Sequence, residues 1–372
     1  MTQEKKSSRL LSLDVFRGIT VACMILVNLP GNQFVYPVIS HSIWNGCHLA
    51  DLVFPFFIYI VGISLVLSLS NQLKAGLHSS ELVVHVVKRT VTIFLLGLFL
   101  NAFPYHFNVD TLRICGVLQR IALCYLFAAC AFLTCKLQTQ IYLLVGLLIG
   151  YWLLMTLIPV EGYGQNNLSP EGNVAAFIDR MMLGSAHLYG KFFDPEGLLS
   201  TLPAIATALL GNITGIWLLS RHDRQLKMWG MVLVGLFLAG IGWFWGLWFP
   251  INKALWTSSY VLWTGGLALN CFALCYWLID IKHWQRWSKP FEIFGMYALA
   301  AYVLHIFSLK IQLMIHLPRM DGSPGTLRSY ITEHLFGWAS QRNASLFYAL
   351  SSVLFWLAVV TFFYRKKITI RV

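Results

Sequence analysis

The chain has 372 residues, of which 58% are hydrophobic and 11% are charged, and its mean hydropathy is +0.67. Soluble domains carry about 25% charged residues, so this composition excludes an ordinary soluble fold and predicts an integral membrane protein. The formal net charge of +12 could indicate a nucleic-acid ligand, but basic residues that flank apolar segments also orient membrane proteins.

Apolar segments long enough to cross a bilayer recur along the chain. A spanning helix needs about 20 apolar residues, and helices are favoured because backbone groups in lipid must be hydrogen-bonded within the segment. We therefore predict an all-α integral membrane protein, a bundle of about ten transmembrane helices in one domain, residues 1–372. The predicted helices cover 12–29, 51–70, 84–103, 113–135, 140–159, 198–219, 228–248, 257–279, 291–312 and 344–364.

Basic residues are distributed unevenly over the predicted connections. If the N-terminus is cytoplasmic, most of the 27 Lys and Arg residues fall on the cytoplasmic side. This pattern predicts that both termini are cytoplasmic, with residues 1–11 as an N-terminal segment, and it explains the net charge without nucleic acid. The predicted periplasmic loops 30–50, 160–197 and 313–343 are the long ones, and long loops often carry function.

The first of these loops is the richest in reactive side chains. His41 in its neutral form can accept a proton at physiological pH, which suits a general base. Asp51 follows at the start of a predicted helix, where it could cap the helix or orient the imidazole. Asn28 precedes the loop and could donate a hydrogen bond to an oxyanion. Trp44 and Asn45 lie between these residues, and we expect them to shape a substrate site.

Four basic residues within or next to spans are candidates for binding an anionic ligand. Arg17 lies three residues after Asp14, so an ion pair that docks the first helix is an equal alternative. Lys88 and Arg89 could bind phosphates or simply anchor the cytoplasmic end of a helix. Arg120 lies within a predicted span and therefore needs a partner or an aqueous cavity.

Two further segments carry polar and aromatic groups that suit a sugar. The second long loop contains Asp194 and Glu196 in a DPEG run, where turn formation is the alternative explanation. Residues 250–260 contain Lys253 and Trp256, and an interfacial aromatic belt would explain the tryptophan equally well. Nucleotide-binding loops, the HExxH and CxxC motifs and the GxSxG elbow do not occur, so we expect no metal site.

Several of these runs together resemble the heparan-alpha-glucosaminide N-acetyltransferase family, including its bacterial members. The resemblance extends in order over nearly the whole apolar part of the chain. It rests on SLDVFRG (12–18), VN (27–28), HxxWNG (41–46), DLVFPFF (51–57), GVLQR (116–120), PEGN (170–173), DPEGLLSTLP (194–203) and NKALWTSSYVL (252–262).

The resemblance implies a multi-pass acyltransferase of the bacterial inner membrane. Acetyl-CoA would bind from the cytoplasmic side, and the acetyl group would pass to the amino group of a glucosamine-type sugar on the periplasmic side. The family's essential histidine matches His41 and its catalytic asparagine matches Asn28. Direct transfer and an acetyl-histidine intermediate both stay open, as do an O-acetyltransferase of envelope glycans and a sugar transporter. The expected partners are the sugar, the lipid bilayer and a second copy in a homodimer.

Overall fold

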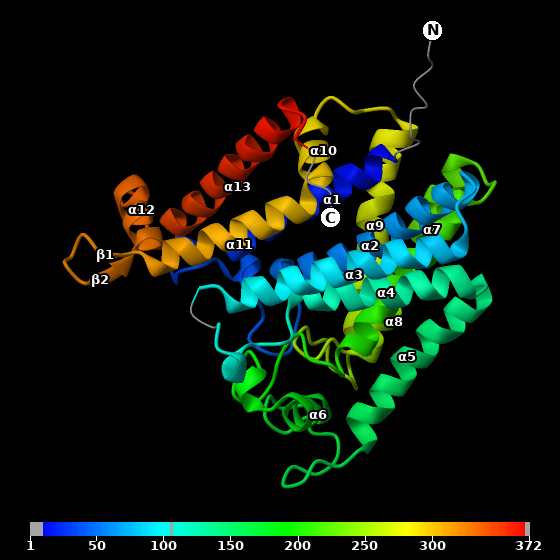
Figure 1. Ribbon diagram of the computed structural model, residues 1–372, viewed down its shortest axis with the longest axis horizontal. Coiled ribbons are helices and arrows are strands. Elements are labelled where there is room, and N and C mark those ends of the chain that lie inside the picture. Colours follow the sequence, from blue (N-terminus) through cyan, green and yellow to red (C-terminus); the bar gives the residue numbers. More distant parts are fainter. Residues whose placement is uncertain (1–9, 105–106, 369–372) are drawn as a thin grey trace. The chain divides into compact units, whose positions relative to one another are not determined.

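The computed structural model describes residues 10–104 and 107–368, and this part of the chain is mainly helical (Figure 1). Of the predicted N-terminal segment 1–11, residues 1–9 lie outside the described residues. The α-helices are α1 (Leu11–Asn28), α2 (Leu49–Lys74), α3 (Ser79–Ala102), α4 (Val117–Thr134), α5 (Leu137–Leu157), α6 (Val174–Leu183), α7 (Thr201–Leu219), α8 (Arg224–Trp245), α9 (Ser258–Tyr276), α10 (Lys289–Met296), α11 (Ala298–Met314), α12 (Leu327–Phe336) and α13 (Gln341–Arg365).

Shorter elements complete the description. Three are single 3-10 turns, and a π-helical stretch extends α9. Two strands form an antiparallel hairpin in which Leu317 pairs with Gly325. These elements are η1 (Pro37–Ile39), η2 (Val109–Thr111), η3 (Ser185–His187), η4 (Trp277–Ile281), β1 (His316–Pro318) and β2 (Pro324–Thr326).

The prediction of an all-α polytopic membrane protein is confirmed. Within 10–104 and 107–368, nine helices are long and apolar enough to cross a membrane. The remaining predicted span, 291–312, corresponds to α10 and α11, which are bent by 79° relative to each other. The break falls at Tyr297, where φ is −109° and ψ is 23°, outside helical geometry. The orientation of the termini and the sidedness of the loops stay predictions.

The helices group into two compact units. The first unit comprises the described residues within 1–40, 223–232 and 269–371, and the second comprises those within 41–222 and 233–268. Because α8 and α9 contribute to both units, the units are not successive segments of the chain. The single domain predicted from the sequence stays a prediction.

In the first unit, α1 and α10 approach each other through glycine. A Cβ on Gly18 would lie 1.8 Å from the carbonyl oxygen of Phe291, and one on Gly295 would lie 1.9 Å from that of Asp14. Only glycine permits such a close approach of two backbones. The hairpin and α12 lie between α11 and α13 along the chain, at the left in Figure 1.

In the second unit, α2 and α7 form the equivalent close crossing. A Cβ on Gly62 would lie 2.2 Å from the carbonyl oxygen of Ala208, and one on Gly211 would lie 2.1 Å from that of Tyr59. A buried hydrogen bond of 2.9 Å from the Tyr59 hydroxyl to Thr214 Oγ1 joins the same two helices. Packing and hydrogen bonding of this kind associate helices where lipid supplies no hydrophobic driving force.

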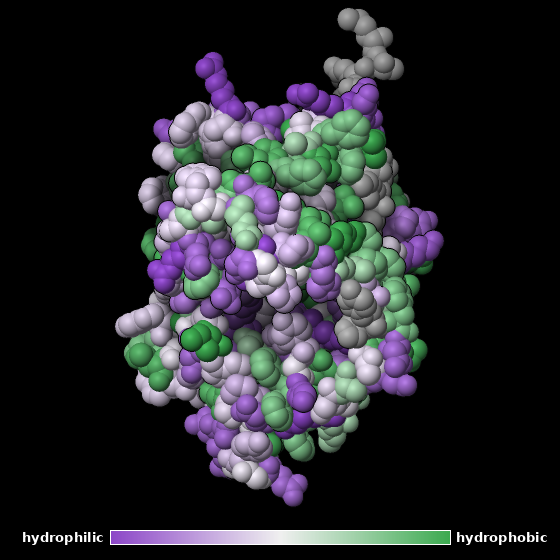
Figure 2. Space-filling model, turned by 90° about the vertical axis from the view of Figure 1, so that its left-hand side faces the viewer, coloured by the Kyte–Doolittle hydropathy of each residue, from purple (hydrophilic) through white to green (hydrophobic). Residues whose placement is uncertain are grey.

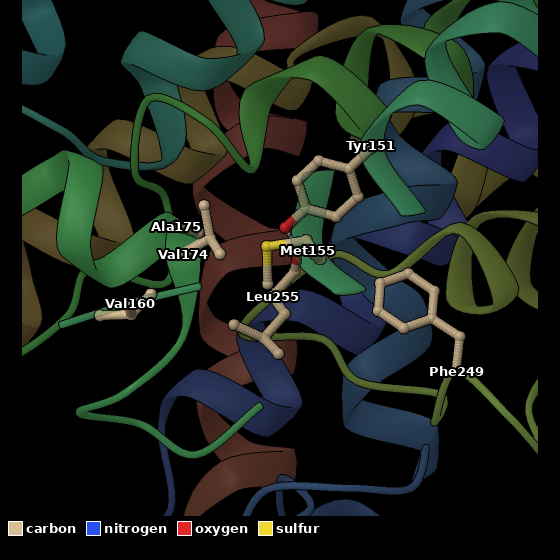
Figure 3. Packing of buried hydrophobic residues seen from close by; sticks show 7 residues of the cluster. All are labelled: Tyr151, Met155, Val160, Val174, Ala175, Phe249 and Leu255. Atoms are coloured by element: carbon tan, nitrogen blue, oxygen red, sulfur yellow. Dashed lines mark hydrogen bonds between the residues drawn. The ribbon is translucent and has the colours of Figure 1, made fainter. Parts of the chain in front are cut away.

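An apolar cluster in the second unit packs helices against loops (Figure 3). It joins α5 and α6 to the loops around residues 160 and 249–255, and the Tyr151 hydroxyl donates a 2.6 Å hydrogen bond to the carbonyl of Leu255. The loop that carries Lys253 is therefore fastened to α5. The cluster consists of Tyr151, Met155, Val160, Val174, Ala175, Phe249 and Leu255.

We expect Gly62→Ala to destabilise the second unit by about 1 to 3 kcal/mol, because the added methyl must push α2 and α7 apart. Gly146→Ala on α5 is the matched control, since a Cβ at Gly146 meets no atom within 4 Å. The midpoints of thermal unfolding in detergent should fall for the first variant and stay equal or rise slightly for the second. Equal midpoints for the two variants would contradict the glycine crossing.

Candidate active site

The start of α2 is organised by one buried carboxylate. The Asp51 side chain is only 1% exposed. Its Oδ2 accepts backbone hydrogen bonds of 3.0 Å from Ser42 and from His48, which precedes the helix. An acidic residue in the first turn satisfies free N–H groups there and interacts favourably with the helix dipole. Asp51 therefore ties the loop to the end of α2.

The other oxygen of this carboxylate holds His41. Asp51 Oδ1 lies 2.8 Å from His41 Nδ1, so the structure brings together the two residues that the sequence predicted to cooperate. The His41 side chain is 48% exposed. Within the described part of the chain, its Nε2 makes no hydrogen bond. One ring nitrogen is thus anchored, while the other faces accessible space.

Lys253 completes the cluster from a distant part of the chain. Its Nζ lies 3.0 Å from His41 Nδ1 and 3.4 Å from Asp51 Oδ1. Burial lowers the pKa of the Lys253 ammonium below its ordinary value, although the Asp51 carboxylate acts in the opposite direction. The sequence placed Lys253 in the substrate site, and the structure places it against the histidine and the carboxylate.

Two neighbours compete for a single nitrogen of the imidazole. Nδ1 cannot both donate a proton to Asp51 and accept one from Lys253. A hydrogen bond from Nδ1–H to a carboxylate is charge-assisted and is the stronger of the two. We therefore assign the proton of the neutral ring to Nδ1, which leaves Nε2 of His41 as the acceptor.

The segment that carries Lys253 is joined to the His41 loop by hydrogen bonds. The Asn252 side-chain amide donates to Asn45 Oδ1 at 3.0 Å, and the Gly46 N–H donates to the carbonyl of Ile251 at 2.7 Å. Asn45, predicted to shape the substrate site, thus links two loops. Trp44 donates from Nε1 to the carbonyl of Leu168 at 2.9 Å, which fastens the loop to the second long loop.

Trp256 lies beneath this site. It is 1% exposed, and its Nε1 donates to Thr207 Oγ1 at 3.1 Å. Its φ of +52° is unusual for a bulky residue. The ring is packed against protein on its accessible faces, and the substrate contact predicted from the sequence stays a prediction. Nearby, the Tyr260 hydroxyl donates to the backbone carbonyl of Asp51 at 2.5 Å.

Asp194 and Glu196 form an ion cluster with Arg113. Asp194 accepts two hydrogen bonds from this guanidinium, at 2.6 and 2.8 Å, and Glu196 accepts one at 2.5 Å. These hydrogen bonds and the two negative charges raise the pKa of Arg113 despite its burial. Asp194 also accepts a hydrogen bond from the Tyr189 N–H at 2.9 Å. The two carboxylates predicted to bind sugar thus hold the second long loop.

The four basic candidates for cofactor binding are divided between the two units. Arg17 belongs to the first unit, where it contacts Asp14 at 3.2 Å and the carbonyl of Gly295 at 3.3 Å, in agreement with the ion-pair alternative. Lys88 and Arg89 are exposed on α3 of the second unit, where Arg89 lies over the ring of Tyr125 at 5.1 Å. These two side chains are free to meet an anion.

Arg120 is fully buried. It donates to the Ser200 hydroxyl and, at 3.2 Å, to the carbonyl of Gly197. Its guanidinium lies 5.0 Å from the centre of the Trp256 ring. These contacts supply the partners that a buried arginine needs, and phosphate binding stays a prediction.

Asn28 lies in the first unit, at the end of α1. Its amide nitrogen is 3.4 Å from Nε2 of His305, whose Nδ1 lies 2.9 Å from the carbonyl of Ala301. His305 is therefore a packed, hydrogen-bonded histidine.

Cys47, the thiol in the His41 loop, is poorly suited to act as a nucleophile. Burial raises the pKa of Cys47 to about 12, so the nucleophilic thiolate is scarce at neutral pH.

The sequence did not reveal the contacts of Lys253 and Tyr260 with Asp51, because no local pattern relates residues so far apart.

Fold and site together define the class of this protein. It is a polytopic all-α membrane protein in which a buried carboxylate holds a half-exposed histidine. Residues 9–243 match the family described as heparan-alpha-glucosaminide N-acetyltransferase, catalytic, and the chain belongs to this family. It is 30% identical to the heparan-alpha-glucosaminide N-acetyltransferase of Mus musculus, over 82% of this chain and 54% of that protein. It is 31% identical to the one of Homo sapiens, over 80% of this chain and 52% of that protein. The chain thus spans about half the length of these curated relatives.

Another buried carboxylate of the second unit, that of Asp179, has a raised pKa. Asp179 on α6 is buried and accepts a 2.9 Å hydrogen bond from the Leu198 N–H. Burial, with help from the Asp194 charge, raises the pKa of Asp179 to about 6. The folded state therefore keeps this proton to a higher pH than the unfolded chain does. Its stabilising contribution is complete below about pH 4 and is lost as the pH rises through about 6.

We expect Asp179→Asn to remove this pH dependence. Relative to the unaltered protein, the variant should gain on the order of 2 kcal/mol between pH 5 and 8, since the neutral amide has no charge to desolvate. Thermal unfolding midpoints of both proteins, measured across this range, give the comparison. A difference that is constant with pH would show that Asp179 does not titrate there.

Proposed function

We propose that the chain is a transmembrane acetyltransferase that moves an acetyl group from acetyl-CoA to the amino group of a glucosamine-type sugar. Membership of the family supports this activity. The observation that carries it is the 2.8 Å contact of His41 Nδ1 with Asp51, because this contact leaves Nε2 accessible as a base.

Acetyl-CoA would supply the acetyl group as a thioester. The sugar nitrogen forms a bond to the acetyl carbon while the carbon–sulfur bond breaks, and CoA leaves as its thiolate. The nitrogen must lose a proton in this exchange, and Nε2 of His41 accepts it. The Asp51 carboxylate stabilises the imidazolium that results, and the thiolate can later take up the proton.

Other parts of the proposal rest on the resemblance to the family and on the exposure of two basic side chains. For Asn28 we propose, from the resemblance alone, a hydrogen bond to the developing oxyanion. Lys88 and Arg89 are the exposed candidates for the phosphates of CoA. We further propose that the protein lies in a bacterial inner membrane, takes its donor from the cytoplasm and acetylates a periplasmic sugar.

We expect His41→Ala to lower kcat by about 10²- to 10⁴-fold, because general-base catalysis contributes this much. The protein should be purified in nanodiscs and supplied with acetyl-CoA and glucosamine, and the product identified by mass spectrometry. Binding of acetyl-CoA should persist in the variant. His85→Ala is the control, since His85 is an exposed histidine on α3.

A His41→Ala variant with kcat within about threefold of the unaltered protein would contradict the assignment. Glucose in place of glucosamine separates N-transfer from O-transfer, because it offers hydroxyl groups and no amine. Acetylation of both sugars at similar rates would argue for an O-acetyltransferase.

We expect Lys253→Met to lower kcat about tenfold with a smaller change in the KM for the sugar. The reason is that the ammonium contacts Asp51, the carboxylate that orients the base. Initial rates over a range of sugar concentrations separate the two constants. A raised KM with unchanged kcat would instead make Lys253 a substrate-binding residue, as the sequence predicted.

A further inference from the structure

Lys253 places a primary amine inside the candidate active site. Its Nζ lies 3.0 Å from Nδ1 of His41 and 3.4 Å from Oδ1 of Asp51. The proposed reaction joins an acetyl group to the amino group of a sugar, and the lysine side chain carries a nucleophile of the same kind. Two amines, one from the sugar and one from the protein, can therefore compete for one acetyl group.

The loop around Lys253 holds this amine in place. The buried Asn252 donates from its side-chain amide to Asn45 Oδ1 at 3.0 Å, and its own Oδ1 accepts a 2.9 Å hydrogen bond from the Leu255 N–H. The Trp256 N–H donates to the carbonyl of Lys253 at 3.1 Å. A nucleophile that is fixed beside the reacting group does not have to be captured from solution, and this lowers the barrier to its reaction.

Lys253 is also accessible from outside. Its side chain is 22% exposed, whereas that of Asp51 is 1% exposed. In the neighbouring loop, His41 and His48 are exposed. Hydrophilic residues are likewise abundant on the side of the molecule that Figure 2 shows. Polar, exposed surface is open to water-soluble ligands, and a donor that brings its acetyl group to His41 brings it close to the Lys253 amine as well.

A lysine attacks a thioester only as the neutral amine. Burial lowers the pKa of the Lys253 ammonium, although the charges of Asp51 and Glu196 act in the opposite direction. Each unit by which the pKa falls raises the fraction of neutral amine about tenfold at neutral pH. The position that brings Lys253 next to the base therefore also increases its reactivity.

We propose that acetyl-CoA acetylates Lys253 when the acceptor sugar is absent, so that the protein limits its own activity. This inference rests on the proposed acetyl transfer. The ammonium first loses a proton to water. The neutral Nζ then forms a bond to the acetyl carbon while the carbon–sulfur bond breaks and CoA leaves as its thiolate. The thiolate takes up the second proton that the nitrogen loses, and the product is an amide.

Acetylation changes the site in two ways. It removes the positive charge that lies 3.4 Å from the Asp51 carboxylate, and it adds an acetyl group beside the imidazole ring of His41. The sugar has to approach the same ring to give up its proton. We therefore expect acetylated protein to lose activity about tenfold, as expected for Lys253→Met. The modified form accumulates where the donor is plentiful and the acceptor is scarce.

The test uses the full chain in nanodiscs, incubated without sugar and with acetyl-CoA that carries an isotope-labelled acetyl group. The label on each lysine is measured over time by digestion and mass spectrometry. We expect Lys253 to acquire label at least about 10-fold faster than Lys191, an exposed lysine of the second long loop. Saturating glucosamine should suppress the labelling of Lys253 and leave that of Lys191 unchanged.

A second measurement follows activity in the same preparation. Incubation with acetyl-CoA before glucosamine is added should lower the rate of transfer by the unaltered protein about tenfold, in step with the label on Lys253. The rate of the Lys253→Arg variant, whatever its starting value, should not decline, because a guanidinium stays protonated and is not a nucleophile. Lys191→Arg is the matched control and should decline as the unaltered protein does.

Three results would overturn the inference while the proposed function stands, because N-acetylglucosamine is still formed in each. They are labelling of Lys253 no faster than that of Lys191, labelling that glucosamine does not suppress, and a Lys253→Arg variant that declines like the unaltered protein. The labelling results come from the unaltered protein and do not depend on the folding of a variant. If no acetylated sugar forms at all, the proposed function itself is wrong, and this inference is wrong with it.

Discussion

The Asp51 carboxylate is the interaction on which the candidate active site depends. It belongs to a spanning helix, yet its oxygens hold residues of a loop and of a segment about two hundred residues further along the chain. A charge buried in this way is tolerated only where donors surround it, and here the donors are two backbone N–H groups, His41 and Lys253. The same contacts that stabilise the carboxylate therefore fix the position of the imidazole.

In the second unit, the helices and loops that carry this site are joined by close packing and hydrogen bonds. The close glycine crossing fixes α2 against α7, and α7 carries Thr207, which accepts the hydrogen bond from Trp256. Trp256 in turn lies three residues from Lys253. Asp51 is thus positioned through α2, and Lys253, which contacts it, is positioned through the loop that carries Trp256. The first unit has its own close crossing at Gly18 and Gly295.

The sequence predicted most of the helices because a membrane demands long apolar segments, and length is visible in a single chain. It also predicted the pair of His41 and Asp51, which lie ten residues apart in one loop and helix start. It did not predict the break at Tyr297, since the apolar character continues through it. The contacts of charged loop residues depend on distant partners: no local pattern predicts that Asp194 accepts two hydrogen bonds from Arg113.

The unequal exposure of the two members of the pair has a consequence for the chemistry. Asp51 is sealed from solvent, but about half of the His41 side chain meets it. A base that bulk water can reach will also activate water, and a thioester beside it is then open to hydrolysis. In an acetyl transfer, the acceptor sugar itself would have to cover the exposed face of the imidazole. The acceptor would then be a substrate and would also exclude water from the imidazole. The order in which the two substrates bind would decide how much acetyl-CoA is hydrolysed without transfer.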